Sequence, residues 1–349
     1  MINQFKIHND KDMEKWDHFI ESHPGGTPFH TSSWLHTIHE TYSFEPLLYV
    51  SKKENGDISS VLPLFRLKSA FFGTRLISLP FSDFCPPLFD TEEDFEEIIS
   101  YLLSTVGKKT KYIEVRGNLP KKTDFICHNY YKQHYIKLTS DPIETKKNIN
   151  KRTIQYSIRK AQKAEVEIRE ENSLQGIEEF YKLNLMTRKK HGVPPQPKKL
   201  FLNLFQHMVA KGYASILLAV WDSLTIAAGI FMRYKETVYY KYNVSNPLYL
   251  TKKSPNHLLT WKAIEQACLE GYRYFDFGRS APDNTGLMRY KEMWGAEKHD
   301  LPYFYYPQVK GIGSKGEGGL LYGIVTKLWR KMPNAIVSKL GPIIYRHLN

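Results

Sequence analysis

One order of predicted elements occurs twice in this chain, and it limits the folds that the sequence can adopt. In the first half, two β-rich runs meet at Asn55-Gly56, a dipeptide typical of hairpins, and the run LISLPF, a helix with an acidic first turn and the strand KYIEVRGN follow. In the second half, two apolar runs meet at Asp222-Ser223, and the strand ETVYYKYNVSN, the helix SPNHLLTWKAIEQACLEG and the strand YRYFDFGRS follow. We therefore predict two related α/β domains.

The segment that joins the two halves is basic and helical in pattern. Asp141 as N-cap, Pro142 at the first helical position and Glu144 at the third form a strong helix start. Residues 146–163 contain seven Lys or Arg and no acid. On one continuous helix, these side chains would divide into a cationic face and an apolar face. The predicted cationic face includes Arg152, Arg159 and Lys163, and the predicted apolar face Ile154, Ile158 and Ala161.

The chain carries a net charge of +13, with 49 Lys and Arg against 36 Asp and Glu. Such a surplus favours anionic partners, namely nucleic acid, phosphorylated small molecules or a membrane surface. A basic surface that only keeps the protein soluble is the alternative. The basic segment could contact tRNA phosphates or a lipid-linked diphosphate, or it could be a solvated face.

Three regions follow from the order of elements. We predict a first domain over residues 1–140, a second over 141–306, and a linker with basic amphipathic helices over 307–349. Residues 320–348 could lie on an anionic membrane or pack on the body of the protein, and the pattern favours packing. The N-terminal residues lack the apolar core of a signal peptide, so we expect a cytoplasmic protein, with peripheral contact at the inner membrane face as the alternative.

The familiar motifs of metal, covalent and nucleotide chemistry are absent. No HExxH, GxSxG, P-loop or GxGxxG occurs, and His36 and His39 lack acidic or thiol companions nearby. Ser157 and Lys160 form SxxK, but the companion motifs SDN and KTG are missing. We therefore predict no metal site and no tightly bound cofactor.

Six stretches together resemble one family. They are FHTSSW at 29–34, SIRKAQKAEVEI at 157–168, YYKYNVSN at 239–246, PNHLLTWKAI at 255–264, DFGRS at 276–280 and GLMRYKEMWGA at 286–296. In this order the chain resembles the FemABX group of peptidoglycan aminoacyl transferases and the FemAB-related (BioF2-like) acetyltransferases of the GNAT superfamily. The resemblance covers about residues 10–306 and implies an α/β (α+β) protein with two tandem GNAT-like domains facing a central cleft.

The resemblance implies that an activated acyl or aminoacyl group passes to an amine. Such a reaction needs an aligned amine, a proton acceptor and a group that stabilises the oxyanion, and it needs no nucleophilic side chain. Lys291 matches the family lysine implicated in stabilising the transferring carbonyl, and Tyr290 takes the place of the usual Phe before it. From spacing alone, Lys291 could instead be a solvated lysine near a helix end.

Four further residues complete the predicted site. Asp276, which we take as catalytic with Lys291, could orient the acceptor amine, and Arg279 could hold a phosphate or carboxylate. The alternative is that these two pair with each other or cap the loop. Tyr242 matches a family tyrosine that faces the acceptor's phosphates, and Arg188 could serve beside it. A half-buried packing tyrosine and a solvated helix end are the alternatives.

The donor is open between charged tRNA and acyl-coenzyme A. Residues 308–313 fit the QxxGxG pattern that cradles coenzyme A pyrophosphate in GNAT enzymes, but they lie outside the expected place and are interpreted as linker. The expected place, PLYLTKKSPN, contains no glycine. The leading hypothesis is aminoacyl or acyl transfer to a phosphorylated or lipid-linked precursor of the bacterial envelope, such as peptidoglycan. The alternatives are an acyl-coenzyme A-dependent N-acyltransferase of exopolysaccharide or lipid modification, and a non-catalytic anion-binding scaffold.

Overall fold

A computed structural model describes residues 2–69, 73–106, 110–121, 123–308, 329–330, 332 and 334–346. The described residues form two compact units, one of residues 2–131 and 300–308, the other of residues 132–299 with the described residues from 329 to 346. The division falls inside strand β7 (Ile126–Lys137) and inside strand β13 (Glu297–Tyr306). The domain boundary predicted after residue 140 lies in the turn that follows β7.

The first unit is a mixed sheet with helices. Its strands, in sheet order, are β1 (Ile2–Phe5), β2 (Glu45–Lys52), β3 (Ile58–Ser69), β4 (Gly73–Ile77), β6 (Tyr112–Arg116) and β13, and the short β5 (Leu88–Phe89) pairs with β3. Its helices are α1 (Asp10–Ser22), α2 (Ser32–Tyr42) and α3 (Glu92–Val106). The hairpin predicted at Asn55-Gly56 joins β2 to β3, so that prediction is confirmed.

The FHTSSW stretch is part of this fold. Thr31 caps α2 by accepting a hydrogen bond from the Trp34 amide. Trp34 is fully buried, and its indole nitrogen donates to the Ser82 hydroxyl at 2.8 Å. The resemblance in this stretch therefore reflects packing within the first unit.

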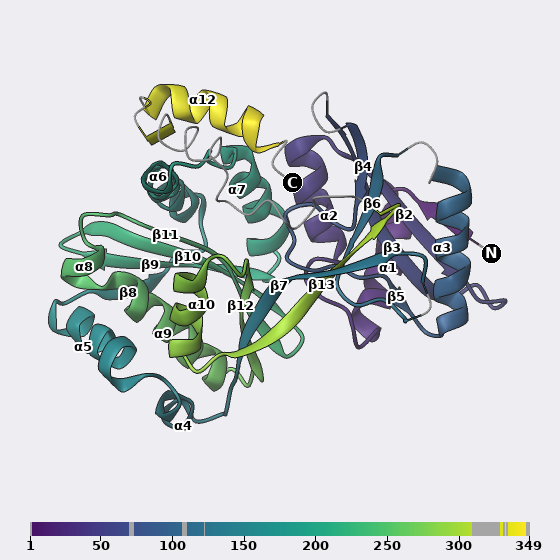
Figure 1. The fold of residues 1–349 in the computed structure, drawn as a ribbon. Coiled ribbons are helices and arrows are strands. Elements are labelled where there is room, and N and C mark those ends of the chain that lie inside the picture. Colours follow the sequence, from purple (N-terminus) through teal and green to yellow (C-terminus); the bar gives the residue numbers. More distant parts are fainter. Residues whose placement is uncertain are drawn as a thin grey trace. The chain divides into compact units, whose positions relative to one another are not determined.

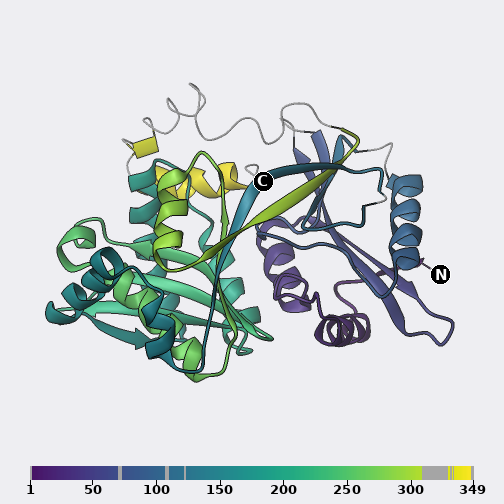
Figure 2. The same cartoon turned by 60° about the horizontal axis from the view of Figure 1, so that its bottom comes forward.

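The second unit is built on a six-stranded sheet within the described residues. In sheet order its strands are β7, β12 (Tyr274–Ser280), β11 (Thr237–Ser245), β10 (Leu224–Tyr234), β9 (Ala214–Trp221) and β8 (Glu167–Glu170). Helices α6 (Leu174–His191) and α7 (Lys198–Leu204), the latter continued by the π-helical turn η3 (Phe205–Val209), cover one face. Helix α9 (Pro255–Leu269) covers the other (Figures 1 and 2).

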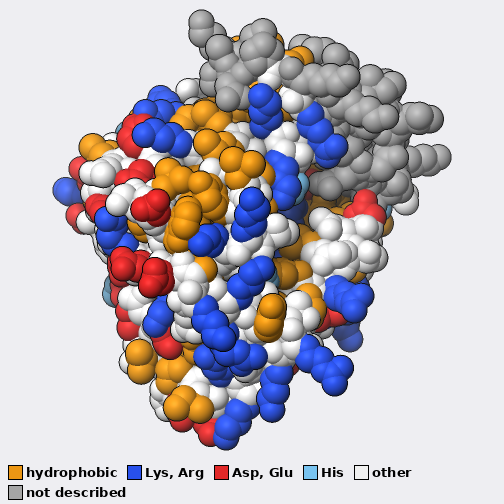
Figure 3. Space-filling model, turned by 90° about the vertical axis from the view of Figure 1, so that its left-hand side faces the viewer, with side chains coloured by type: hydrophobic (Ala, Val, Ile, Leu, Met, Phe, Trp, Pro, Cys, Tyr) orange, Lys and Arg blue, Asp and Glu red, His pale blue; other side chains and the backbone are white. Residues whose placement is uncertain are grey.

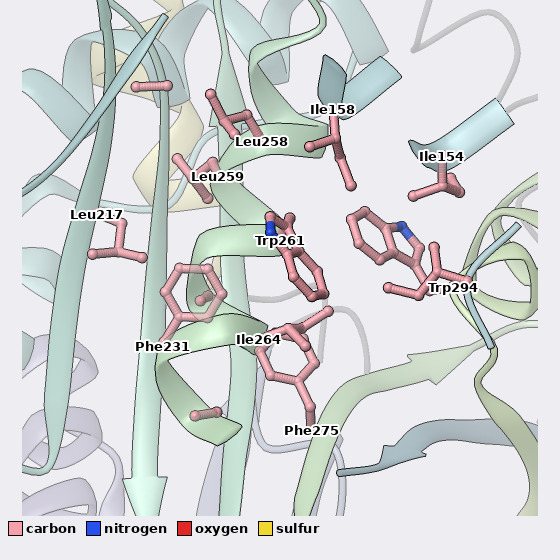
Figure 4. Packing of buried hydrophobic residues seen from close by; sticks show 14 of the residues in the cluster. Ile154, Ile158, Leu217, Phe231, Leu258, Leu259, Trp261, Ile264, Phe275 and Trp294 are labelled. Atoms are coloured by element: carbon pink, nitrogen blue, oxygen red, sulfur yellow. The ribbon is translucent and has the colours of Figure 1, made fainter. Parts of the chain in front are cut away.

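The core of the second unit lies between the sheet and α9. Figure 4 shows Trp261 and Ile264 of α9 packed toward Phe231 and Phe275 of the sheet. Trp294 of the GLMRYKEMWGA stretch is fully buried in the same cluster. Two of the family-like stretches therefore meet in one core.

The basic segment does not form the single helix that the sequence predicts. It consists of α4 (Pro142–Lys147), the π-helical turn η2 (Lys151–Gln155) and α5 (Tyr156–Lys163). The predicted cap is confirmed, because the Asp141 carboxylate accepts from the Ile143 amide at 2.8 Å. The predicted apolar face is confirmed as well: Ile154, Ile158 and Ala161 are all fully buried.

The helix breaks because the segment is held by a neighbouring helix. The Asn150 amide donates to the Met293 carbonyl at 2.9 Å, at the end of α10 (Thr285–Met293). Gly295 has a φ of +80°, and a Cβ placed there would lie 2.9 Å from the Asn148 carbonyl oxygen. The glycine thus allows the backbone of the basic segment to approach the end of α10.

None of the described helices combines the length and the apolar character that a membrane crossing requires. Within the predicted basic tail, helix α12 (Asn334–Tyr345) is described and contacts α6, whereas residues 320–328 lie outside the described residues. Residues 309–313 of the QxxGxG pattern also lie outside them.

Candidate functional site

The neighbouring parallel strands β11 and β12 separate partway along the second unit's sheet. They pair at Thr237 with Tyr274, at Val238 with Phe275 and at Tyr239 with Asp276. Beyond Asp276, these two described strands continue to Ser245 and Ser280 without further pairing to each other. We call the region beyond Asp276, where β11 and β12 no longer pair with each other, the strand opening.

Asp276 stands at the point where the strands separate. Its side chain is buried, and its carboxylate accepts from the Gly278 amide at 2.7 Å and from the Gln133 amide side chain at 2.6 Å. On its other side, β12 pairs with β7 with a register shift between Asp276 and Arg279, where Gly278 adopts a φ of 70°. The carboxylate therefore stabilises a bulge that redirects the end of β12.

Lys291, a residue of helix α10, contacts the same bulge of β12. Its side chain is only 4% exposed, and Nζ donates to the Gly278 carbonyl at 2.8 Å and to the Arg279 carbonyl at 3.0 Å. Lys291 is thus not the solvated lysine of the alternative interpretation.

Partly buried aromatic side chains of β11 and α10 pack on the core in this part of the second unit. Tyr240 of β11 accepts a hydrogen bond from the Thr260 hydroxyl at 3.2 Å, and Tyr290 contacts His257 and Trp294. Burial raises the pKa of Tyr240 and of Tyr290, and it lowers the pKa of His257 to about 4. These groups are therefore neutral near pH 7.

His134 of β7 is a candidate that sequence reasoning missed. Its side chain is fully buried, and within the described residues neither ring nitrogen has a hydrogen-bond partner. Burial and the nearby Lys291 ammonium lower its pKa to about 4. Near pH 7 the imidazole is therefore neutral, and with a pKa this low it is a weak base. No motif marks this residue, which is the single histidine in the run YYKQHYIK.

A cationic pocket of about 540 Å³ opens between the end of α6 and the part of β11 that does not pair with β12. Its described lining includes the cations Arg188, Lys241 and Arg330, the histidine His191, whose pKa is lowered by burial, and no acid. Tyr242 and the α10 cap residue Asn284 line it as well. Such a lining suits a phosphate, a diphosphate or a carboxylate.

The predicted site residues thus form two groups. Arg188 and Tyr242 line the cationic pocket, where Arg188 Nε donates to the Gln196 side chain at 2.9 Å and Tyr242 packs on Phe201. The second group surrounds the strand opening and consists of Asp276, Arg279, Tyr290 and Lys291. Their roles toward a substrate stay predictions.

A larger cavity of about 1120 Å³ lies against another face of α6 and the β9–β10 turn. Its lining mixes Glu165, Glu167, Glu179 and Asp222 with Arg169 and Lys182, and it includes none of the predicted site residues. We therefore place the candidate site at the smaller pocket and the strand opening.

The loop that would hold coenzyme A pyrophosphate in a GNAT enzyme has a different structure here. The short helix α8 (Leu250–Lys253) occupies the connection between β11 and α9. Ser254 follows with a φ of 52°, and its side chain does not cap α9. Among the described residues, no cluster of His, Cys, Asp and Glu is arranged to bind a metal ion.

Comparison with known proteins bears on the fold and on the family of the second unit. The profile of the acetyltransferase (GNAT) domain matches residues 150–292. No curated protein matches the chain.

Three solved structures share the fold. FemX has a TM-score of 0.66 at 15% identity, with 88% of this chain and 97% of FemX covered. L-PGS from Bacillus licheniformis has a TM-score of 0.59 at 12% identity, with 91% and 97% covered. A tandem GNAT protein of the clavulanic acid pathway, solved without AcCoA, has a TM-score of 0.54 at 11% identity, with 87% and 97% covered.

These findings confirm the resemblance to the FemABX group and the α/β fold of tandem GNAT type. With a GNAT domain over residues 150–292, the prediction of a GNAT-fold transferase is confirmed as well.

Proposed function

We infer that this GNAT-fold transferase transfers an aminoacyl or acyl group from an activated donor to an amine on a phosphorylated component of the cell envelope. The observation that carries the proposal is the cationic pocket, because it adjoins the strand opening within one unit. An anionic group of the acceptor would bind Arg188, Lys241 and Tyr242, and its amine would then reach the opening.

The residues around the opening fit the chemical demands of this step. The amine nitrogen forms a bond to the donor carbonyl carbon, the ester or thioester bond breaks, and the amine proton passes to the leaving group. Lys291 would provide positive charge near the developing oxyanion, and the leaving group would take up the amine proton. Asp276 would act by fixing the bulge, and Arg279 by holding a carboxylate or phosphate.

We favour aminoacyl-tRNA as the donor and keep acyl-coenzyme A as the alternative. Helix α8 replaces the glycine-rich loop that binds pyrophosphate in coenzyme A-dependent enzymes, and FemX and L-PGS share the fold. The fold shared with the tandem GNAT protein of the clavulanic acid pathway, for which AcCoA is the named ligand, supports the alternative. Transfer would then serve exopolysaccharide or lipid modification.

Thermal unfolding with separate ligands tests the proposal. We expect charged tRNA, but not uncharged tRNA, to raise the melting temperature, and inorganic pyrophosphate to stabilise through the cationic pocket. Arg188→Ala should remove the pyrophosphate effect, whereas Arg273→Ala, an exposed cation paired with Glu236, should keep it. Stabilisation by acyl-coenzyme A alone would shift the assignment to the alternative donor. Absence of stabilisation both by charged tRNA and by acyl-coenzyme A would contradict the proposal.

A further inference from the structure

One strip of the second unit's surface combines many cations with exposed apolar side chains. It comprises residues 142–163 (α4, η2 and α5) and residues 246–253 (the turn into α8 and α8 itself), and we call it the basic strip. Residues 146–163 contain seven Lys or Arg and no acid, and α8 adds Lys252 and Lys253. Figure 3 shows the Lys and Arg side chains spread over this side of the molecule.

The helices of the strip lie flat on the unit, with one face inward and the other outward. The inward face of η2 and α5 is fully buried, as described above. The outward positions Arg152, Tyr156, Arg159 and Lys163 are exposed and follow helical spacing. Lys160 donates from Nζ to the Thr251 carbonyl at 2.6 Å, which joins α5 to α8. The strip is therefore a continuous outer surface.

Three large apolar side chains project from this cationic surface. Ile143 is 69% exposed, Tyr156 58% and Leu248 74%. Single exposed apolar residues are common on soluble proteins. Three that are more than half exposed, interleaved with cations along one surface, match the pattern of helices that lie in a membrane interface.

We propose that the basic strip docks the protein on an anionic membrane surface. RNA phosphates would attract the same cations, but RNA rewards aromatic stacking, and the strip exposes one ring, Tyr156, because Tyr249 is half-buried and packs on Trp221. Ile143 and Leu248 gain free energy from contact with hydrocarbon, so their exposure favours a lipid partner over RNA.

Docking at the strip would narrow the acceptor class of the proposed function, and this part of the inference rests on that proposed function. Leu248 follows closely after Val244, which lines the cationic pocket. A membrane bound at the strip would bring lipid-linked phosphates to the unit that carries this pocket. The acceptor class would then be a phosphorylated lipid or a lipid-linked precursor.

Vesicle sedimentation of the full chain tests the docking without any transfer assay. The vesicles contain either phosphatidylcholine alone or phosphatidylcholine with phosphatidylglycerol. We expect binding only to the latter, and a loss of at least about tenfold in partition coefficient for Arg152→Glu/Arg159→Glu, since each cation contributes roughly fivefold. The matched charge reversal Lys11→Glu/Lys15→Glu, on α1 of the first unit, should keep most of the binding.

A second pair of variants separates lipid from simple charge attraction. Tyr156→Ser/Leu248→Ser should reduce vesicle binding about tenfold while the net charge stays constant. The membrane proposal would be overturned in favour of RNA by two results together. Vesicle binding would be unchanged in Tyr156→Ser/Leu248→Ser but weakened in Arg152→Glu/Arg159→Glu, and the protein would bind tRNA more tightly than vesicles. Loss of vesicle binding only in Leu340→Ser/Ile343→Ser of α12 would overturn the strip as the docking surface. Transfer to a lipid-free acceptor is measured separately, so failure of docking and failure of the proposed function give different results.

Discussion

Replacing Lys291 by Met tests whether a buried ammonium fixes the end of β12. The variant keeps a side chain of similar length but removes both hydrogen bonds to the Gly278 and Arg279 carbonyls. A hydrogen bond from a charged donor contributes about 1.5 kcal/mol or more, so two give about 3 kcal/mol. In a unit of this size that corresponds to a fall in melting temperature of about 6–12 °C.

The assay is calorimetric unfolding of the full chain, with Lys298→Met as the matched control. Lys298 is about half exposed and pairs with Glu292 at 3.5 Å, so its loss should cost less than about 1 kcal/mol. Equal stability of Lys291→Met and the wild-type protein would refute the positioning role. At a temperature where both proteins are folded, turnover should fall about 100-fold, and unchanged turnover would remove Lys291 from the mechanism.

The same variant changes a second observable, the pKa of His134. The Lys291 ammonium helps to hold that pKa at about 4, although burial is the larger cause. Removing the positive charge should therefore raise the pKa of His134, while burial keeps it below the ordinary value of about 6.5. An NMR titration of the imidazole reports the change. A His134 pKa unmoved by the substitution would show that the two groups are not electrostatically coupled.

Three further predictions concern the surroundings of the opening. Asp276→Asn should lower the free energy of unfolding by about 1–3 kcal/mol. The two carboxylate oxygens accept separately from the Gly278 amide and the Gln133 side chain, and an Asn side chain keeps only one of these oxygens. Equal midpoints of urea unfolding would contradict this prediction. Gly295→Ala should cost about 1 kcal/mol or more, because its φ is +80° and the new Cβ meets the Asn148 carbonyl, and a stabilised variant in the same urea assay would argue against that contact. His134 binds its proton more weakly in the folded protein than in the unfolded protein. Burial of this group therefore does not change the free energy of unfolding above pH 6.5, and that free energy falls by up to about 3 kcal/mol as the pH falls from 6.5 to 4. His134→Gln should flatten that part of the pH profile of unfolding free energy, and an unchanged slope would count against the burial.

Local sequence pattern was sufficient to predict most of the fold. The turn at Asp222-Ser223 is present with φ values of 49° and 60° at its two residues, and β9 and β10 flank it as predicted. Helix α6 is capped by Ser173 and ends at Gly192 in the left-handed conformation. Caps and turns depend on neighbouring residues, so a single sequence can reveal them.

The features that were missed depend on contacts distant in sequence. The break in the basic segment depends on the hydrogen bond between Asn150 and the end of α10, and the sequence of residues 146–163 alone does not predict this contact. His134 gains its low pKa from burial and from Lys291, which is remote in sequence. Lys291 itself was predicted from a motif, but its two carbonyl partners arise from a bulge that β7 and β12 form together.

Helix α10 relates the two groups of site residues to each other. Its cap residue Asn284 accepts from the Leu287 amide at 3.2 Å and also lines the cationic pocket. Two turns later, Lys291 on the same helix holds the bulge of β12. Because one short helix contributes to both places, an anion that orders its first turn would also constrain the lysine at the opening. Under the proposed function, the pocket and the opening would therefore be parts of one site, in which binding of the acceptor's anionic group would align the residues placed around the reacting carbonyl.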